Sequence, residues 1–320
     1  MYKVCNTIQS EKEEMRCIFG EVMDQLASMD KRVIYLDSDI INSIKMVDFA
    51  TKYPDRTINC GIQEANMIGV AAGLSDTGLI PYAHTFAPFA TRRVMDQVFV
   101  SCAYAKLNVR IIGSDPGITA GVNGGTHIPL EDIGMMRCVP HVTIIEPTDS
   151  IVLKDMLVQT KDKFGVFYIR LSRKKSEKIY EDDSTFEIGK ANLIEQGSDA
   201  TIIASGICVA DAIKASKLLK KENINVRILD MFTIKPIDKE AIICAAKETG
   251  AIVSVENHNI INGLGSAVAE VLVENAPVPM IRLGAPDQFG EVGDIDYLKK
   301  KFHMEVKDIV TAVKTVISRK

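Results

Sequence analysis

Apolar and polar positions alternate along the chain with two periods, one typical of buried strands and the other of amphipathic helices. A short apolar run at residues 33–36 predicts a strand, and the apolar positions before it repeat at helical spacing: Met15, Ile18, Phe19, Val22 and Leu26. The pattern Ser10-Glu11-Lys12-Glu13 resembles a capping box, so we expect it to open this helix. Further strands are predicted at residues 80–83, 109–113, 142–145 and 166–169, with helices at 92–105, 130–138 and 150–160.

A charged segment at residues 173–183 interrupts this pattern and reads as an interdomain linker. The alternation resumes with strands at 200–206, 226–229 and 251–256 and helices at 209–220, 239–249 and 263–274. Strands that alternate with helices favour parallel, doubly wound sheets. We therefore predict an α/β protein with two domains: a doubly wound parallel-sheet domain in residues 1–180, linker included, and a smaller α/β domain in residues 181–320.

Composition excludes several classes of protein. With 320 residues, 47% hydrophobic and 25% charged, and a net charge of −4, the chain is an ordinary globular protein without the basic excess that nucleic acid requires. No apolar run approaches the roughly 18 residues of a membrane span. Its seven cysteines are scattered and form no Cys-x-x-Cys pair, which argues against a metal site or disulfide framework and favours a cytoplasmic location.

Glu64 is the first candidate for chemistry. It follows a turn at Gly61 and lies in the first turn of a predicted helix, among apolar or small residues. A carboxylate at this position is stabilised by the helix dipole, so a lone Glu here is more often structural than catalytic. The glycine-rich segment 113–125, with five glycines, reads as a loop whose backbone approaches a ligand or as an ordinary surface loop.

Four motifs in fixed order change this balance. They are Gly-Ile-x-Glu at 61–64, Pro-Tyr-x-x-Thr-Phe-x-x-Phe at 81–89, Gly-x-Thr-His-x-Pro-x-Glu at 124–131 and Arg-x-x-Pro at 137–140. Each motif alone is weak, but the set resembles the pyrimidine-binding domain of transketolase. The second half resembles the transketolase C-terminal domain, and the similarity extends from about Ser10 to Lys320.

The resemblance implies a cofactor, thiamine diphosphate, and assigns residues to it. Glu64 would hydrogen-bond N1′ of the aminopyrimidine, which favours the imino tautomer that removes the proton from C2. Phe86 and Phe89 would surround the pyrimidine ring, although aromatic residues at this spacing are usually core. Asp39 falls where transketolases have an Asp near the cofactor. His84 is open to two interpretations, a proton relay or a hydrogen-bonded structural residue.

The same resemblance predicts a substrate pocket. His127 would lie beside the sugar and donate to hydroxyls or transfer a proton. Arg173 matches an Arg that transketolases use for the substrate phosphate, and Arg16 and Ser43 match the same pocket more weakly. The alternative interpretation of both arginines is a solvated surface charge.

Two departures from the family pattern concern specificity. Many transketolases have His-Asp where this chain has Ser114-Asp115, and Glu-Asp-Gly where it has Val122-Asn123-Gly124. The family Asp contacts a substrate hydroxyl, whereas Asn123 lacks the charge and gains two donors. The pattern leaves open whether these positions select an unusual ketose or reflect neutral drift, and whether the substrate anion is a phosphate or a sulfonate.

One motif of transketolases has no counterpart here. The module that binds the diphosphate and its divalent cation carries Gly-Asp-Gly, and this chain has no such sequence. We therefore expect the C-terminal subunit of a split transketolase, with Mg²⁺ held mainly by a separate N-terminal subunit and two such pairs forming an α2β2 assembly. The predicted reaction transfers a two-carbon ketol unit from a phosphorylated ketose to an aldose. The alternatives are a β-type subunit of another thiamine-diphosphate enzyme, such as a 2-oxo acid dehydrogenase or a deoxyxylulose phosphate synthase, and a non-catalytic subunit.

Overall fold

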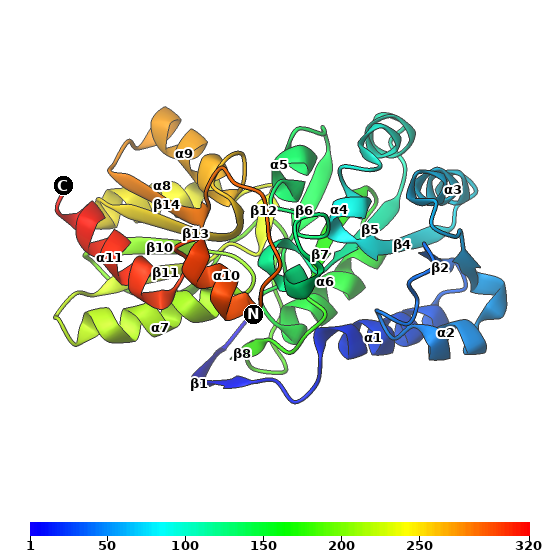
Figure 1. Cartoon of the computed structure of the whole chain (residues 1–320), viewed down its shortest axis with the longest axis horizontal. Coiled ribbons are helices and arrows are strands. Elements are labelled where there is room, and N and C mark those ends of the chain that lie inside the picture. Colours follow the sequence, from blue (N-terminus) through cyan, green and yellow to red (C-terminus); the bar gives the residue numbers. More distant parts are fainter.

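Two α/β domains, each built on a mainly parallel β-sheet, lie side by side in the computed structural model, which describes all residues 1–320 (Figure 1). The larger sheet has seven strands in the order β12-β6-β7-β5-β4-β2-β3, and the smaller has five in the order β14-β13-β10-β11-β9. Only β12 in the larger sheet and β9 in the smaller run antiparallel to their neighbours. The predicted fold class of two α/β domains is confirmed.

The larger sheet consists of β2 (Val33–Asp37), β3 (Thr57–Asn59), β4 (Ile80–Phe86), β5 (Val109–Ser114), β6 (Val142–Ile145), β7 (Val166–Leu171) and β12 (Thr233–Lys235). Helices α1 (Met15–Met29) and α6 (Ser150–Asp162) cover one face. Helix α3 (Glu64–Asp76), the π-helix η2 (Gln97–Tyr104) and α5 (Asp132–Arg137) cover the other. The sheet is therefore doubly wound, as expected from the alternating pattern.

The smaller sheet consists of β9 (Asn192–Glu195), β10 (Ala200–Ala204), β11 (Val226–Asp230), β13 (Ile252–Asn259) and β14 (Met280–Ala285). Helices α7 (Cys208–Lys220) and α11 (Val306–Ile317) pack on one face, and α8 (Lys239–Thr249) and α9 (Leu264–Asn275) pack on the other. The remaining helices are short: α2 (Val47–Lys52), α4 (Ala87–Ala90), α10 (Ile295–Lys301), and the 3₁₀ turns η1 (Pro54–Arg56) and η3 (Gly117–Asn123). No helix combines the length and apolar character needed to cross a membrane.

Two local predictions are wrong. The expected helix at 92–105 begins with turns at residues 91–94 and continues as the π-helix η2. Ser10 is not a helix cap: it ends strand β1 (Val4–Ser10), which pairs with β8 (Glu177–Tyr180), and α1 begins only at Met15. The Glu11 carboxylate is buried and accepts hydrogen bonds from the backbone and side chain of Ser150 and from Ser176, so it serves tertiary contacts. The segment 173–183 lies between the two sheets, as the linker prediction expected, but it is ordered in part, because β8 and the buried Tyr180 lie within it.

A buried ion cluster joins the two halves. Arg170, on β7, is wholly buried and contacts Asp132 through two hydrogen bonds of 2.8 and 3.0 Å, and it also pairs with Glu146. Its guanidinium donates to the carbonyl oxygen of Asn257 on β13, 3.0 Å away, which ties the two sheets together. Burial alone would raise the pKa of Asp132, but Arg170 and its other partners hold this pKa below its usual value. This cluster therefore fixes β7 of the larger sheet against β13 of the smaller sheet.

Candidate active site

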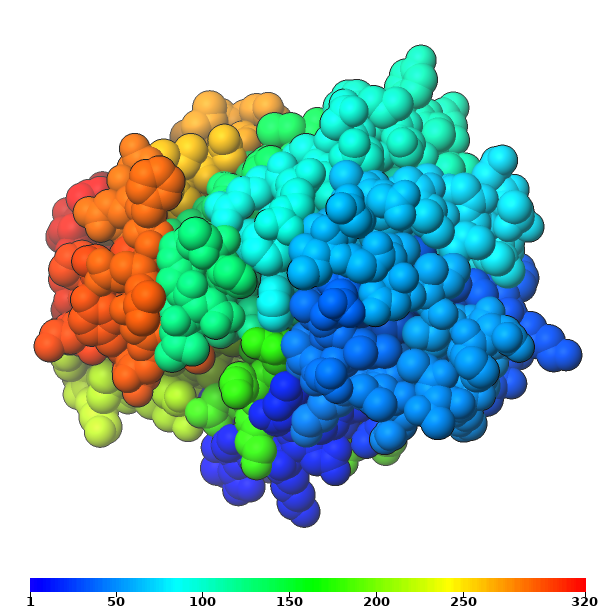
Figure 2. Space-filling model, turned by 45° about the vertical axis from the view of Figure 1, so that its right-hand side comes forward, coloured from blue at the N-terminus to red at the C-terminus, as the bar shows by residue number.

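The candidate site lies where β2, β4 and β5 end, the edge at which open α/β sheets bind ligands. The glycine-rich loop that follows β5 packs against the segment between β14 and α10, residues 286–294 (Figure 2). A Cβ atom on Gly125 would lie only 2.3 Å from the carbonyl oxygen of Gly290, so glycine is required for this close approach. The second half of the chain thus forms one side of the site.

Glu64 is the first residue of α3, and its side chain is almost completely buried. Its Oε1 atom accepts a hydrogen bond from Nη1 of Arg93 at 2.7 Å. The Arg93 guanidinium also stacks on Phe89, with its Cζ atom 3.8 Å from the ring centroid. The expectation of only apolar or small residues around Glu64 is therefore incomplete, because one arginine reaches its carboxylate.

Three aromatic rings gather beside this carboxylate. Phe86 and Phe89 lie edge to face with centroids 6.3 Å apart, and His127 contacts both rings at 5.9 and 5.1 Å. The Nδ1 atom of His127 is hydrogen-bonded to the hydroxyl of Thr126 at 2.8 Å. The structure thus brings together the phenylalanines of one motif and the histidine of another.

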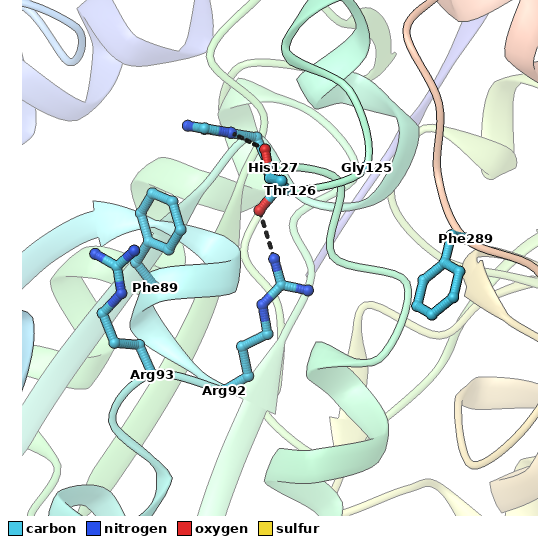
Figure 3. Close-up of a pocket in the computed structure, with 7 residues that line it drawn as sticks. All are labelled: Phe89, Arg92, Arg93, Gly125, Thr126, His127 and Phe289. Carbon is cyan, nitrogen blue, oxygen red and sulfur yellow. Dashed lines mark hydrogen bonds between the residues drawn. The ribbon is translucent and has the colours of Figure 1, made fainter.

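A cavity of about 880 Å³ opens next to these rings. Figure 3 shows its lining: Phe89, Arg92, Arg93, Gly125, Thr126, His127 and Phe289. Arg92 pairs with Glu131 at 2.9 Å and also donates to the carbonyl oxygen of Thr126. Phe289, from the second half of the chain, is 95% exposed on the opposite wall (Figure 3).

A second cluster forms around the backbone of Ser43. Arg16 and Arg173 both donate to its carbonyl oxygen, at 2.9 and 3.4 Å. Arg173 also pairs with Asp115 and lies over the ring of Phe86, with its Cζ atom 5.0 Å from the centroid. The structure therefore assembles the four predicted residues Arg16, Ser43, Asp115 and Arg173, and Phe86 connects them to the aromatic group.

The remaining predicted residues lie in different surroundings. Asp39 is exposed in the loop after β2 and accepts a hydrogen bond from Asn59 at 2.9 Å. Asn123 is exposed at the end of η3. Ser114 is wholly buried at the end of β5, and its hydroxyl is hydrogen-bonded to Nε2 of His84 at 3.0 Å. Its hydroxyl is therefore already engaged within the protein.

Sequence reasoning missed Arg92, Arg93 and Phe289. The two arginines follow Phe89 at intervals of three and four residues, which was the one available signal that they share its surroundings. Phe289 lies 200 residues further along the chain, and no local pattern indicates its place. No group of three or more His, Cys, Asp or Glu side chains is arranged to hold a metal ion.

Comparison with protein-family models assigns both halves of the chain. Residues 11–178 match the transketolase pyrimidine-binding domain, and residues 189–309 match the transketolase C-terminal domain. A domain of the first kind implies thiamine diphosphate as the cofactor.

Three relatives match this chain over most of their own length. The chain is 46% identical over 313 residues to the 6-deoxy-6-sulfo-D-fructose transketolase subunit of a Clostridium strain, covering 98% of this chain and 97% of that one. It is 38% identical to a subunit of the apulose-4-phosphate transketolase of Phocaeicola vulgatus, covering 84% and 86%. A solved split-gene transketolase, described as an inactive β4 tetramer, superposes with a TM-score of 0.90 at 38% identity and covers 96% and 99%.

These matches extend over nearly the whole chain and over both of its domains. A split enzyme of this kind implies an N-terminal subunit as partner. The chain therefore belongs to the transketolase family, as the C-terminal subunit of a split transketolase.

Proposed function

We propose that this subunit, joined to an N-terminal subunit, transfers a two-carbon ketol unit from a ketose with an anionic tail to an aldose. One observation carries the proposal: a continuous row of contacts links the buried carboxylate to the arginine cluster. The row runs through Glu64, Arg93, Phe89, Phe86, Arg173, Ser43 and Arg16. In this proposal the Glu64 end of the row binds the cofactor, His127 lines the middle, and the Arg16 end binds the anion of the substrate.

The cofactor end fits an aminopyrimidine. The Arg93 guanidinium is planar, stacks on Phe89 and donates a hydrogen bond to Glu64. A pyrimidine ring that bonds to a carboxyl through N1′ and packs against an aromatic ring would need the same two contacts. When bound, thiamine diphosphate supplies the reactive carbanion centre, while Glu64 holds the pyrimidine and shares its proton. Phe86 would complete the contacts with the pyrimidine ring. Asp39, exposed in the loop after β2, is proposed to lie near the cofactor.

Arg93 and the pyrimidine would therefore compete for Glu64. Replacing Arg93 by methionine, which keeps a flexible apolar stem, should lower the thiamine diphosphate concentration for half-maximal activity several-fold. Arg92→Met is the matched control, because Arg92 lines the same cavity but pairs with Glu131 instead. Titration of the reconstituted enzyme with cofactor measures both variants. A concentration that is unchanged or raised in Arg93→Met would mean that Arg93 does not occupy the pyrimidine position.

The diphosphate end of the cofactor must be held elsewhere. The chain contains no Gly-Asp-Gly module, and it has no clustered metal ligands. The N-terminal subunit is therefore proposed to hold the diphosphate with Mg²⁺. Two pairs in an α2β2 assembly are the simplest closed arrangement of such subunits.

The substrate end favours an anion. The Ser43 hydroxyl and the Oδ1 atom of Asp115 are buried without a hydrogen-bond partner. Buried polar atoms are normally paired, so a ligand is proposed to complete both atoms. The Ser43 hydroxyl can donate to an anionic group, whereas Oδ1 of Asp115 can only accept and therefore suits a hydroxyl of the same sugar. Arginine is suited to phosphate and sulfonate groups because its guanidinium offers a fixed fork of donors. His127 faces the middle of the row, where it is proposed to contact the sugar, and Asn123 is proposed to contact a sugar hydroxyl.

Charge balance favours a sulfonate tail over a phosphate. Glu14 and Lys45 extend the cluster, because Glu14 pairs with Arg16 at 2.8 Å and with Lys45 at 3.2 Å. The extended cluster has one positive charge in excess: Arg16, Lys45 and Arg173 against Glu14 and Asp115. A phosphate monoester carries about −1.5 to −2 at pH 7, whereas a sulfonate carries a single charge that the cluster matches. The name of the 46% identical relative, a 6-deoxy-6-sulfo-D-fructose transketolase subunit, supports the same choice.

A donor panel tests this proposal. The reconstituted enzyme should show a higher kcat/KM for 6-deoxy-6-sulfofructose than for fructose 6-phosphate or xylulose 5-phosphate. Asp115→Asn removes one carboxylate from the cluster, so it should shift the ratio several-fold towards the phosphorylated donors. A wild-type preference for a phosphorylated ketose, apulose 4-phosphate included, would contradict the sulfonate assignment. Transfer from pyruvate in place of all ketoses would contradict the transketolase reaction.

A further inference from the structure

A buried hydrogen-bond chain crosses three strands beneath the arginine cluster, which consists of Arg16, Ser43, Asp115 and Arg173. The carboxylate of Asp37, on β2, accepts from the hydroxyl of Tyr35 at 2.8 Å and lies 3.2 Å from Nδ1 of His84, on β4. The other ring nitrogen of His84, Nε2, lies 3.0 Å from the hydroxyl of Ser114, on β5. With Nδ1 donating to the carboxylate, Nε2 is left to accept from Ser114. All four side chains are completely buried.

This arrangement resembles a nucleophile–base–acid triad, but it is not accessible as one. Ser114 is wholly buried, and it lines neither the cavity beside His127 nor the neighbouring one of about 650 Å³. A serine nucleophile must reach a substrate carbonyl, so nucleophilic catalysis is excluded in this conformation. The hydrogen-bond chain must therefore act through the loops that are attached to its two ends.

Each end of the hydrogen-bond chain is attached to a loop on one side of the arginine cluster. At the β2 end, Oδ1 of Asp37 accepts a hydrogen bond of 2.6 Å from the backbone of Ile40, which fixes the loop that presents Ser43. At the β5 end, Ser114 directly precedes Asp115, the ion-pair partner of Arg173. Arg173 in turn donates to the carbonyl oxygen of Ser43, so it joins the Ser43 and Asp115 sides of the cluster.

We propose that His84 is a positioning residue that sets the spacing of the Ser43 and Asp115 loops and thereby the affinity for the anionic tail of the substrate. The role rests on the proposed function, because it acts through Arg16 and Arg173. His84 also lies two residues before Phe86 on the same strand, and alternate residues of a strand point to the same face. His84 therefore lies on the same face of β4 as Phe86, the ring that Arg173 covers.

The role predicts a selective kinetic effect. His84→Phe keeps a planar ring but removes both hydrogen bonds, so the two loops lose their common support. We expect a higher KM for a ketose with an anionic tail and little change for fructose, which has a hydroxyl in place of the anion. The ratio of kcat/KM values, 6-deoxy-6-sulfofructose over fructose, should fall about tenfold, the change expected from one modest contact energy.

Two further variants separate positioning from plain destabilisation. His84→Gln retains an acceptor for Ser114, so it should recover part of the ratio, and it carries the test if His84→Phe fails to fold. Tyr82→Phe is the matched control, because Tyr82 precedes His84 on the same face of β4 and its buried hydroxyl bonds to the carbonyl oxygen of Leu157. This control should lower the melting temperature without changing the donor ratio.

The outcomes distinguish this inference from the proposed function. Equal loss of kcat/KM for both donors in His84→Phe and His84→Gln, with wild-type transfer intact, would overturn the positioning role alone. Absence of two-carbon transfer by the wild-type reconstituted enzyme with every donor would overturn the proposed function and this role with it. A selective loss on the charged donor, partly recovered by glutamine, is the result that the structure predicts.

Discussion

Replacing Glu64 by glutamine is expected to lower the turnover of the reconstituted enzyme by a factor on the order of 10²–10⁴, the usual contribution of a positioned acid or base. The amide is nearly isosteric and keeps an oxygen that can accept from Arg93, so the fold around α3 should be preserved. It cannot share a proton with N1′ of the pyrimidine, and the cofactor's C2 proton should therefore exchange slowly. Steady-state kinetics and C2 proton exchange measure the two effects.

Glu131→Gln provides a matched control for this variant. Glu131 borders the same region, and it too loses an arginine ion pair, with Arg92, when it becomes an amide. Burial raises the pKa of Glu131, so the control also removes a carboxyl group whose pKa is shifted. Normal turnover in Glu131→Gln beside a large loss in Glu64→Gln would assign the effect to the carboxyl at 64. Near-normal turnover and proton exchange in Glu64→Gln would remove the central residue of the proposed site.

The isolated subunit is expected to bind thiamine diphosphate weakly and to be inactive. In the proposed site, Glu64 and the two phenylalanines would contact only the pyrimidine end of the cofactor, and the chain has no Gly-Asp-Gly module for the diphosphate and Mg²⁺. The cavity beside His127 is open, and Phe289 on its wall is almost fully exposed, so solvent would enter a site formed by this chain alone. Binding of the N-terminal subunit should both supply the missing contacts and exclude water.

Much of the fold could be predicted because the strongest signals were local. Strands β2, β5 and β7 of the larger sheet are mostly apolar runs, and burial on both faces makes such runs nearly continuous. Strands β1 and β8 were missed because they are partly exposed and pair with each other across more than 160 residues. The apparent capping box was misread for the same reason: its Glu11 pairs with Ser150 and Ser176, which are distant in the sequence.

The site was predictable only as far as its motifs reach. Family motifs supplied Glu64, Phe86, Phe89 and His127, and the structure brings these side chains into one region. Arg93 could not be placed because its contact with Glu64 depends on the turns that precede η2, where the pattern predicted a regular helix from residue 92. The hydrogen-bond chain through His84 could not be derived either, since it depends on the register of three parallel strands.

Cofactor binding by the separated and mixed subunits tests the central claim most directly. Calorimetric titration with thiamine diphosphate and Mg²⁺ should be done on this chain, on an N-terminal subunit from the same organism, and on their equimolar mixture, with two-carbon transfer assayed in parallel. The split-enzyme account predicts tight, Mg²⁺-dependent binding and transfer only in the mixture. Tight, Mg²⁺-dependent binding by this chain alone would contradict it.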